Sequence, residues 1–318
     1  MRFGYRIAAL PAGALLLAST LGCGGSTDTE LFTTGAGGAG TSSTSAGGSS
    51  TAAAGGASAS STTSAATGAS TSTGGTTTEP FSFFVTSLRA MQEQSGSPNG
   101  FGGDFRLGET GAGAGLRGAD KLCTKIAEKS MPGSGSKQWR AFLSAASGED
   151  GKQVDAIDRI GAGPWYDRLG RLVAANPADL LHDRPVGIDP AIKDDFPNED
   201  GVPNHQPDPT QGEVDNHDTL TGTNSQGKLY SSTATCKDWT SALGNKATEG
   251  KPRVGHSWPR NGGGGPGGGS MANWMSSLDE SGCAPGVNLI EMGPPQNNST
   301  TVGSGGGYGG IYCFALKP

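Results

Sequence analysis

The sequence is poor in the apolar residues that build a large hydrophobic core. Only 33% of its 318 residues are hydrophobic, whereas 56 are Gly. The composition therefore disfavours a single large α/β enzyme core over the whole length. Positive charge is also scarce, since 23 Lys and Arg face 29 Asp and Glu, the formal net charge is −6, and no basic cluster interrupts this acidity. Because phosphate binding needs concentrated positive charge, we expect no nucleic-acid partner.

The sequence also lacks the short motifs that mark common catalytic sites. It contains neither the G-x-S-x-G turn of many hydrolases nor the H-E-x-x-H motif of zinc proteases. The glycine-rich run at residues 261–270 (NGGGGPGGGS) lacks the Lys-Ser/Thr pair that ends a phosphate-binding loop. No C-x₂-C pair is present, which disfavours a four-cysteine zinc site. We therefore expect a protein that is not an enzyme.

Residues 1–22 are typical of a secretory signal peptide. Arg2 and Arg6 precede an apolar stretch over residues 7–21, which is shorter than the roughly 20 residues that a bilayer-spanning helix needs. Residues 20–23 (TLGC) resemble a bacterial lipobox, in which Cys23 is acylated and becomes the first mature residue, although Leu is more usual than Thr at position 20. The alternative is an ordinary cleaved signal with an incidental cysteine. The lipid interpretation predicts an exported protein anchored to the membrane of the cell envelope, at the outer membrane or cell surface.

Residues 23–80 consist almost entirely of Ser, Thr, Gly and Ala, with Asp28, Glu30 and Glu79 as their charges. Such a segment cannot bury enough apolar surface to offset the entropy lost on ordering. We expect a disordered tether with a root-mean-square reach on the order of 40 Å.

Residues 81–318 contain all 5 tryptophans and are expected to form one folded domain. Aromatic and β-branched residues predict a strand over 81–86, and alternating patterns predict strands over 138–144 and 310–316. Apolar residues at three- and four-residue spacing predict a helix over 116–130. Long loops separate these elements, which together indicate an α+β domain.

The cysteines indicate disulfide bonds. If Cys23 carries lipid, the other cysteines form an even set in an exported chain, namely Cys123, Cys236, Cys283 and Cys313. Four cysteines allow three connectivities. The residues alone do not choose among them.

Five short motifs, taken in order, resemble the endostatin-like branch of the C-type lectin-like fold as found in bacterial surface lipoproteins. They are residues 115–123 (GLRGADxxC), 139–144 (WRAFLS), 221–227 (TGTNxxG), 236–241 (CxDWTS), and Cys283 with 311–314 (IYCF). The resemblance covers most of residues 81–318 and implies a lectin-like domain with nested disulfides, Cys123 with Cys313 and Cys236 with Cys283. The outer bond would close a long loop, which favours stability.

An acidic segment at residues 194–218 carries eight carboxylates and no Lys or Arg. Oxygen ligands at this density suit calcium, and the segment falls where the resembled fold carries its long loop. A solvated acidic loop is the alternative, which we favour. Residues 206–208 (QPD) match a signature of galactose-type lectins, but the Trp-Asn-Asp sequence that accompanies it there is absent. The candidate calcium ligands are Asp200, Asp208, Glu213, Asp215 and Asp218.

Histidines and tryptophans supply the remaining candidates. His205 and His217, with Asp208 or Asp215, have the chemistry of a zinc site, but no regular spacing places them on one face, so solvated loop histidines are the favoured interpretation. His182 and His256 lie outside the acidic segment, and no histidine precedes Cys123, so the endostatin zinc site does not carry over.

Two tryptophans flank the glycine-rich run. Trp258 and Trp274 could stack on a sugar ring, although packing in the core is favoured for both. The candidate ligand-binding residues are therefore Trp258, Trp274, Gln206 and Asp208.

These patterns favour a membrane-anchored lipoprotein whose lectin-like domain presents loops 182–227 and 256–275 to a ligand. The ligand would be an extracellular carbohydrate or a matrix protein. One alternative is a metal-dependent envelope hydrolase that uses the acidic segment, and another is a structural surface protein with no discrete ligand. No cofactor is certain, and calcium is the candidate.

Overall fold

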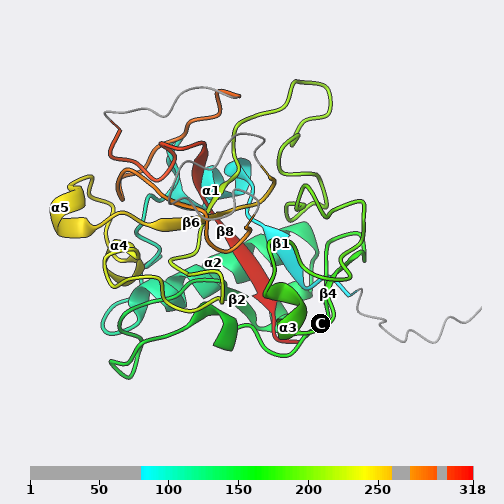
Figure 1. Cartoon of the computed structure of the whole chain (residues 1–318), viewed down its shortest axis with the longest axis horizontal. Coiled ribbons are helices and arrows are strands. Elements are labelled where there is room, and N and C mark those ends of the chain that lie inside the picture. Colours follow the sequence, from blue (N-terminus) through cyan, green and yellow to red (C-terminus); the bar gives the residue numbers. More distant parts are fainter. Residues whose placement is uncertain (1–79, 260–272, 292–298, 318) are drawn as a thin grey trace, which may run out of the picture. The chain divides into compact units, whose positions relative to one another are not determined.

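The computed structural model describes residues 80–259, 273–291 and 299–317 (Figure 1). All of them belong to one compact unit of the chain. The predicted signal peptide, Cys23, the glycine-rich run at 261–270 and the tether up to residue 79 lie outside the described residues. Among the residues described, none of the helices has the length and apolar character to cross a bilayer.

Strand β8 (Gly307–Ala315) is the centre of the main sheet. It pairs antiparallel with β1 (Phe83–Val85) and with β2 (Trp139–Ala141), and parallel with β5 (Asp218–Leu220). The sheet continues from β5 through β6 (Arg253–His256) to β7 (Leu278–Asp279), and these pairings are antiparallel. A separate hairpin pairs β3 (Trp165–Tyr166) with β4 (Leu172–Ala174). The strands predicted over 81–86, 138–144 and 310–316 are thus confirmed in place.

The helix predicted over residues 116–130 is confirmed as α2 (Ala114–Ser130), which packs along β2 and β8. A helix that the sequence analysis missed, α1 (Leu88–Ser95), begins where the Ser87 side chain accepts the N–H of Ala90, and it ends at Gly96 with φ of 68°. Such caps satisfy helix-end groups that would otherwise lack partners. The shorter helices are η1 (Ser134–Lys137), η2 (Ala156–Asp158), α3 (Pro177–Leu180), α4 (Cys236–Trp239) and α5 (Lys246–Glu249).

The main sheet buries a different cluster of side chains on each face, as the two-residue period of a strand requires. Phe84, Ile311 and Cys313 pack with α2 in one cluster. Phe83 and Phe314 face the other side, where they pack with aromatic residues from the loops. Both faces are covered, so the polar ends of the strands and the connecting loops are what remains for ligand contact.

The structure contains the nested disulfides, Cys123–Cys313 and Cys236–Cys283. The first joins α2 to β8, and the second joins α4 to the segment after β7. Together with the mixed helix and strand content, they establish an α+β domain.

Glycines of the motif at residues 115–123 let other segments approach α2 closely. A Cβ atom on Gly115 would lie 2.1 Å from the carbonyl oxygen of Asp238, and one on Gly118 would lie 2.0 Å from that of Phe105. Both distances are far below van der Waals contact, so a larger residue would push these segments away. The glycine spacing therefore has a packing cause.

The motif at residues 236–241 forms an unusual backbone turn. Cys236, Lys237, Asp238 and Trp239 all have positive φ, between 48° and 63°. A left-handed turn of non-glycine residues costs roughly 1–2 kcal/mol per residue. Asp238 offsets part of this cost by accepting the N–H groups of Ala146 and Ser147.

Candidate functional site

Residues of loop 182–227 and Asn273, near the end of loop 256–275, line a cavity of about 320 Å³, which we call the two-loop cavity. This volume lies within the usual range for small-molecule sites. Asp183, Asn224 and Ser225 come from the first loop and Asn273 from the second, so the cavity joins segments far apart in the sequence. Its lining residues are Asp183, Asn224, Ser225, Tyr230, Arg253, Asn273 and Ser276.

Bonds within the protein hold the polar groups of this cavity in place. The Asn273 amide donates to Asp183 Oδ1 (3.1 Å), and Arg253 Nε donates to Ser276 Oγ (2.9 Å). The Arg253 guanidinium also lies 4.4 Å from the centre of the Tyr230 ring. Because these contacts exist before any ligand arrives, little side-chain entropy remains to be lost on binding.

The turn at residues 221–227 places Asn224 at the rim of the same cavity. Its side-chain oxygen accepts the N–H groups of Gln226 (2.9 Å) and Lys228 (3.1 Å), and Gly227 completes the turn with φ of 69°. This side chain-to-backbone turn is the type that Asn favours. The turn therefore fixes the Asn224 side chain where it lines the cavity.

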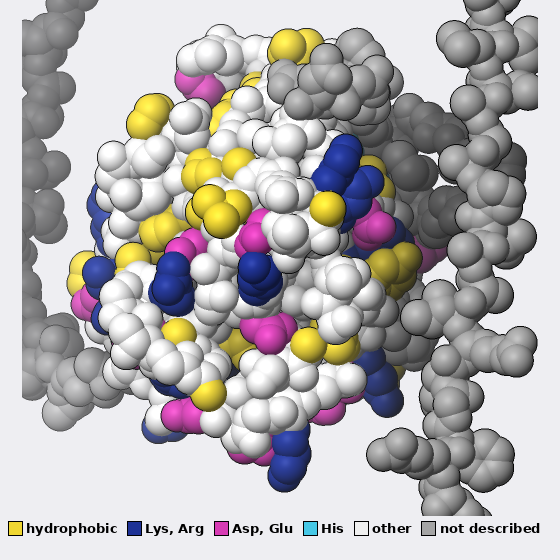
Figure 2. Space-filling view, turned by 90° about the vertical axis from the view of Figure 1, so that its left-hand side faces the viewer, with side chains coloured by type: hydrophobic (Ala, Val, Ile, Leu, Met, Phe, Trp, Pro, Cys, Tyr) yellow, Lys and Arg dark blue, Asp and Glu magenta, His cyan; other side chains and the backbone are white. Residues whose placement is uncertain are grey.

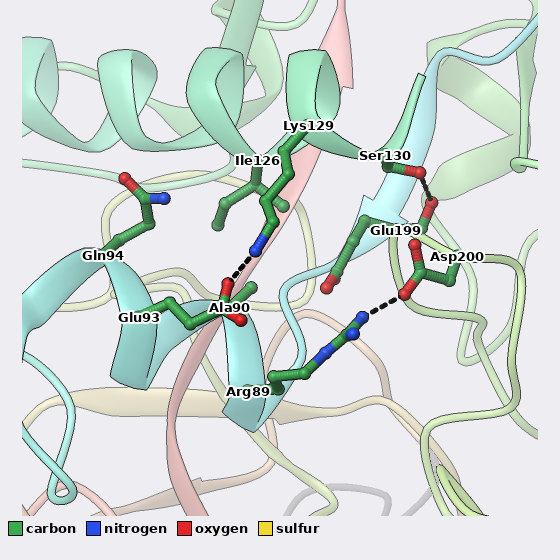
Figure 3. Close-up of a pocket in the computed structure, with 9 residues that line it drawn as sticks. All are labelled: Arg89, Ala90, Glu93, Gln94, Ile126, Lys129, Ser130, Glu199 and Asp200. Atoms are coloured by element: carbon green, nitrogen blue, oxygen red, sulfur yellow. Dashed lines mark hydrogen bonds and ion pairs between the residues drawn. The ribbon is translucent and has the colours of Figure 1, made fainter. Parts of the chain in front are cut away.

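Other faces of the domain carry charges of both signs close together. Figure 2 shows the face that holds α4 and α5, where basic and acidic side chains are interspersed. A smaller cavity of about 190 Å³ lies between α1, the end of α2 and the acidic segment (Figure 3). There Arg89 pairs with Asp200, and Lys129 pairs with Glu93. These four charges therefore compensate one another in two pairs.

The structure does not bring the five calcium candidates into one group. Asp200 pairs with Arg89 at the surface, and Asp208 accepts hydrogen bonds from Thr210 and Gln211. These two carboxylates line one cavity of about 480 Å³, together with the loop residues beside Gln206. Gln206 itself donates to the Gln211 carbonyl (3.3 Å).

The remaining calcium candidates bond to histidines. Glu213 lies 3.7 Å from His205 Nε2 at the surface, whereas Asp215 and Asp218 are buried beside His217. The carboxylates thus divide among separate environments because β5 begins at Asp218 and carries the end of the acidic segment into the interior.

Both candidate tryptophans are buried. Trp274 packs against Phe142 and Tyr312 in the core, with its Nε1 donating to the Leu180 carbonyl (3.0 Å). Trp258 is 4% exposed, stacks on His205 with ring centres 3.6 Å apart, and donates to Asn216 (2.9 Å). In this arrangement neither indole offers an open face to a sugar.

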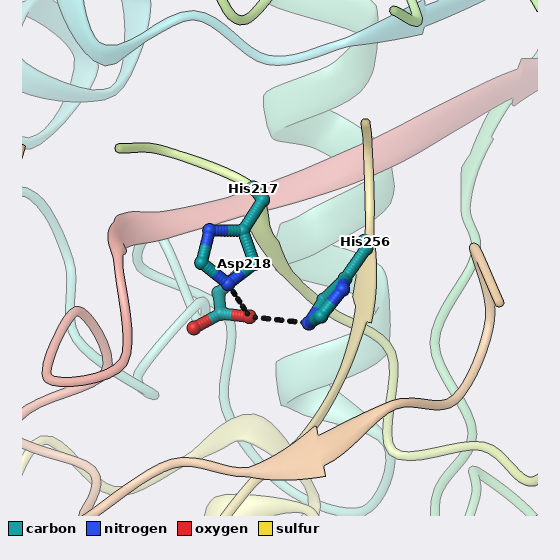
Figure 4. A group of neighbouring side chains, drawn as sticks. All are labelled: His217, Asp218 and His256. Atoms are coloured by element: carbon teal, nitrogen blue, oxygen red, sulfur yellow. Dashed lines mark ion pairs between the residues drawn. The ribbon is translucent and has the colours of Figure 1, made fainter. Parts of the chain in front are cut away.

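His217, Asp218 and His256 form what we call the buried histidine cluster (Figure 4). Asp218 Oδ1 lies 3.3 Å from His217 Nε2 and 3.1 Å from His256 Nε2. His217 Nδ1 lies 2.6 Å from Asp215 Oδ1, and His256 Nδ1 lies 3.4 Å from Ser277 Oγ. Burial alone would raise the pKa of Asp218, but the neighbouring histidines together hold it below its usual value.

Glu280 and a glycine segment enclose this cluster. Glu280 accepts hydrogen bonds from Ser304 Oγ and from the N–H of Gly305, and its carboxyl group contacts Asp218. Burial, reinforced by the charge of Asp218, raises the pKa of Glu280 well above its usual value. A Cβ on Gly305 would lie 2.4 Å from Asp218 Oδ2, so the backbone can pass this close only without a side chain.

The zinc arrangement considered from the sequence, His205 and His217 with Asp208 or Asp215, is only partly assembled. His217 meets Asp215, but His205 instead lies 3.2 Å from Glu291, and His182 is exposed. Sequence reasoning missed His256 and Glu280 as partners of Asp218. A signal was present in Asp215 and Asp218, which lie within two residues of His217, but nothing local indicates which distant histidine joins them.

Neither the protein-family models nor the curated proteins include a match to this chain. The geometry above is therefore the basis for assigning a function.

Proposed function

We propose that this chain is a lipid-anchored surface protein whose domain binds a carbohydrate in the two-loop cavity. The observation that carries the proposal is that residues of loop 182–227 and Asn273 line one preformed cavity. Its lining includes a carboxylate, two amides, three hydroxyl groups and a guanidinium, all of which can bond sugar hydroxyls. Tyr230, which is 46% exposed, offers ring surface beside them.

The fold is consistent with a lectin-like module, which forms part of the same proposal. Support comes from the nested disulfides and from the pairing of β1 with β8, which brings segments distant in sequence side by side. Fold alone does not fix function, so the chemistry of the cavity bears the argument. Anchoring through acylated Cys23 and the tether at residues 23–80 would hold this cavity away from the membrane.

Glycan-array binding of the full chain tests the carbohydrate proposal. We expect selective binding that persists in EDTA, because the lining of the two-loop cavity needs no metal. Tyr230→Ala should weaken binding about tenfold, which corresponds to about 1.4 kcal/mol. Leu243→Ala, which alters another exposed residue outside the cavity, is the matched control and should bind as the wild type does.

Absence of glycan binding, or equal loss in both variants, would end the carbohydrate proposal. Capture of a matrix protein that is insensitive to Tyr230→Ala would also count against it. Anchoring is tested separately by Cys23→Ser, which should move the protein from membranes to the soluble fraction. Unchanged membrane association would contradict the lipid proposal.

The metal-dependent hydrolase alternative gains no specific support. The cluster best suited to a metal, His217, Asp218 and His256, is fully buried, which leaves no path for a substrate in this arrangement.

A further inference from the structure

We propose that the buried histidine cluster binds one zinc ion, through Nε2 of His217, Nε2 of His256 and the carboxylate of Asp218. These donor atoms lie within 4.8 Å of one another. The separations of Asp218 Oδ1 from the two nitrogens are 3.3 and 3.1 Å. In a tetrahedral site with bonds of 2.0–2.1 Å, neighbouring ligand atoms are roughly 3.3 Å apart. Two edges of such a site are therefore already formed (Figure 4).

The hydrogen bonding of His217 points to a cation between its ring and Asp218. The 2.6 Å contact with Asp215 assigns the Nδ1 proton of His217 to that carboxylate. In a neutral ring, Nε2 then turns its lone pair toward the ionised oxygen of Asp218, 3.3 Å away. Two lone pairs at this distance repel, and either a metal ion or a second proton on the ring converts the repulsion into attraction.

The residues that contact the outer ring nitrogens of the two histidines are of the type found around metal-binding histidines. A histidine that binds metal through one nitrogen usually donates its other N–H to a carboxylate or another acceptor, which fixes the ring. Asp215 has this role for His217, and Ser277 Oγ lies 3.4 Å from the outer nitrogen of His256. Two imidazoles with a carboxylate suit zinc, whereas calcium takes oxygen ligands throughout.

Glu280 supplies a candidate fourth ligand. Its Oε2 accepts hydrogen bonds from Ser304 and Gly305, and its Oε1 is also buried. The Glu280 carboxyl group also contacts Asp218. A site with four protein ligands and no exposure is of the structural type, so this zinc would join β5, β6 and the segment after β7.

The test is zinc binding by the full chain after removal of metal with a chelator. We expect one zinc per chain by metal analysis and calorimetry, and a tetrahedral absorption spectrum with cobalt as the probe. Zinc at about 100 times Kd should raise the melting temperature by on the order of 5 to 10 °C. Asp215→Asn should weaken zinc binding by about 10- to 100-fold, because it removes only the support of one ligand.

Variants locate the site. His256→Ala and Asp218→Asn should both abolish stoichiometric zinc binding. Because Asn has nearly the shape of Asp, Asp218→Asn still tests the site if His256→Ala does not fold. His182→Ala alters an exposed histidine and should bind as the wild type does. His205→Ala tests the surface group formed with Glu213 and Glu291.

Three outcomes would overturn the proposal. They are a wild-type chain that takes up no zinc at micromolar concentration, loss of binding in His205→Ala alone, and full binding in both Asp218→Asn and His256→Ala. The first outcome would mean that a second proton on His217, and not a metal ion, faces Asp218. The two-loop cavity contains none of these residues, so failure here leaves the proposed function intact.

Discussion

Asp208 and Asp218 belong to the same acidic segment but have opposite surroundings. Asp208 accepts hydrogen bonds from Thr210 and Gln211 beside it in the chain, and these bonds hold its pKa below the usual value. Asp218 starts β5 and is buried between two histidines from different segments. The contacts of Asp208 come from the turn in which it lies, whereas those of Asp218 come from segments that are brought together by the fold. A dense run of carboxylates is therefore not evidence of one shared site.

The strongest test of the difference between Asp208 and Asp218 is to remove each carboxylate in turn. Asp218→Ala should cost about 3 to 5 kcal/mol, because it leaves buried polar partners without their counter-charge. Asp208→Ala should leave the stability equal to that of the wild type within experimental error, because water can bond the exposed donors that Asp208 now accepts. Urea unfolding of both variants measures the difference. Equal effects would show that the two residues share one environment after all.

A second, smaller contrast compares two neighbours near the start of the acidic segment, Glu199 and Asp200. Glu199 is buried and accepts both the N–H and the hydroxyl of Ser87 at the start of α1. Glu199→Ala should destabilise by about 1 to 3 kcal/mol, since those donors lose their acceptor. Asp200→Ala removes a surface ion pair and should have a much smaller effect. The melting temperatures of the two variants measure this difference. A larger decrease for Asp200→Ala than for Glu199→Ala would contradict the structural role given to Glu199.

The pH dependence of stability sharpens the comparison at Asp195. Burial raises the pKa of Asp195 to about 6, even though the N–H of His205 donates to its carboxylate. The folded state thus binds its proton more tightly than the unfolded state, whose pKa is about 3.9. Stability from this group is complete below about pH 4 and is lost as the pH rises through 6.

Unfolding of Asp195→Asn between pH 3.5 and 7 provides the measurement. Relative to the wild type, the variant should gain stability as the pH rises, because it has no charge to bury. Asp194→Asn changes the exposed neighbour and serves as the control. A constant difference between wild type and Asp195→Asn at every pH would contradict the raised pKa.

Calcium should have the smallest effect. The five candidate ligands, Asp200, Asp208, Glu213, Asp215 and Asp218, are divided among separate groups. Millimolar calcium should therefore leave the melting temperature equal to that in EDTA. An increase on the order of 5 to 11 °C would instead show that the segment rearranges to gather them.

The parts of the fold that could be predicted from the sequence are those with local causes. The periodicity of residues 116–130 identified α2, and alternation identified β8, because each pattern reflects burial of one face. The cysteine pairing came from resemblance and agrees with the structure. The left-handed turn at Cys236–Trp239 has no such local pattern, since its residues are not glycines.

The candidate sites were harder to predict because their residues meet only through tertiary pairing. His256 reaches Asp218 through the register of β5 with β6, which no spacing along the chain encodes. Tyr230 and Arg253 line the two-loop cavity but carry no motif of their own. Trp274 shows the converse case, since the sequence favoured core packing over stacking on a sugar, and its aromatic contacts confirm this.

The position of β8 also sets the order in which the domain can fold. Residues 307–315 pair with β1, β2 and β5, so strands from the start and the middle of the domain have no common partner until this late segment is available. Contacts that span so much sequence are slow to form, because a long loop must close first. A chain that is still being synthesised should therefore remain unfolded until residues 307–315 are available. Truncation before residue 307 should yield a chain that stays sensitive to proteases.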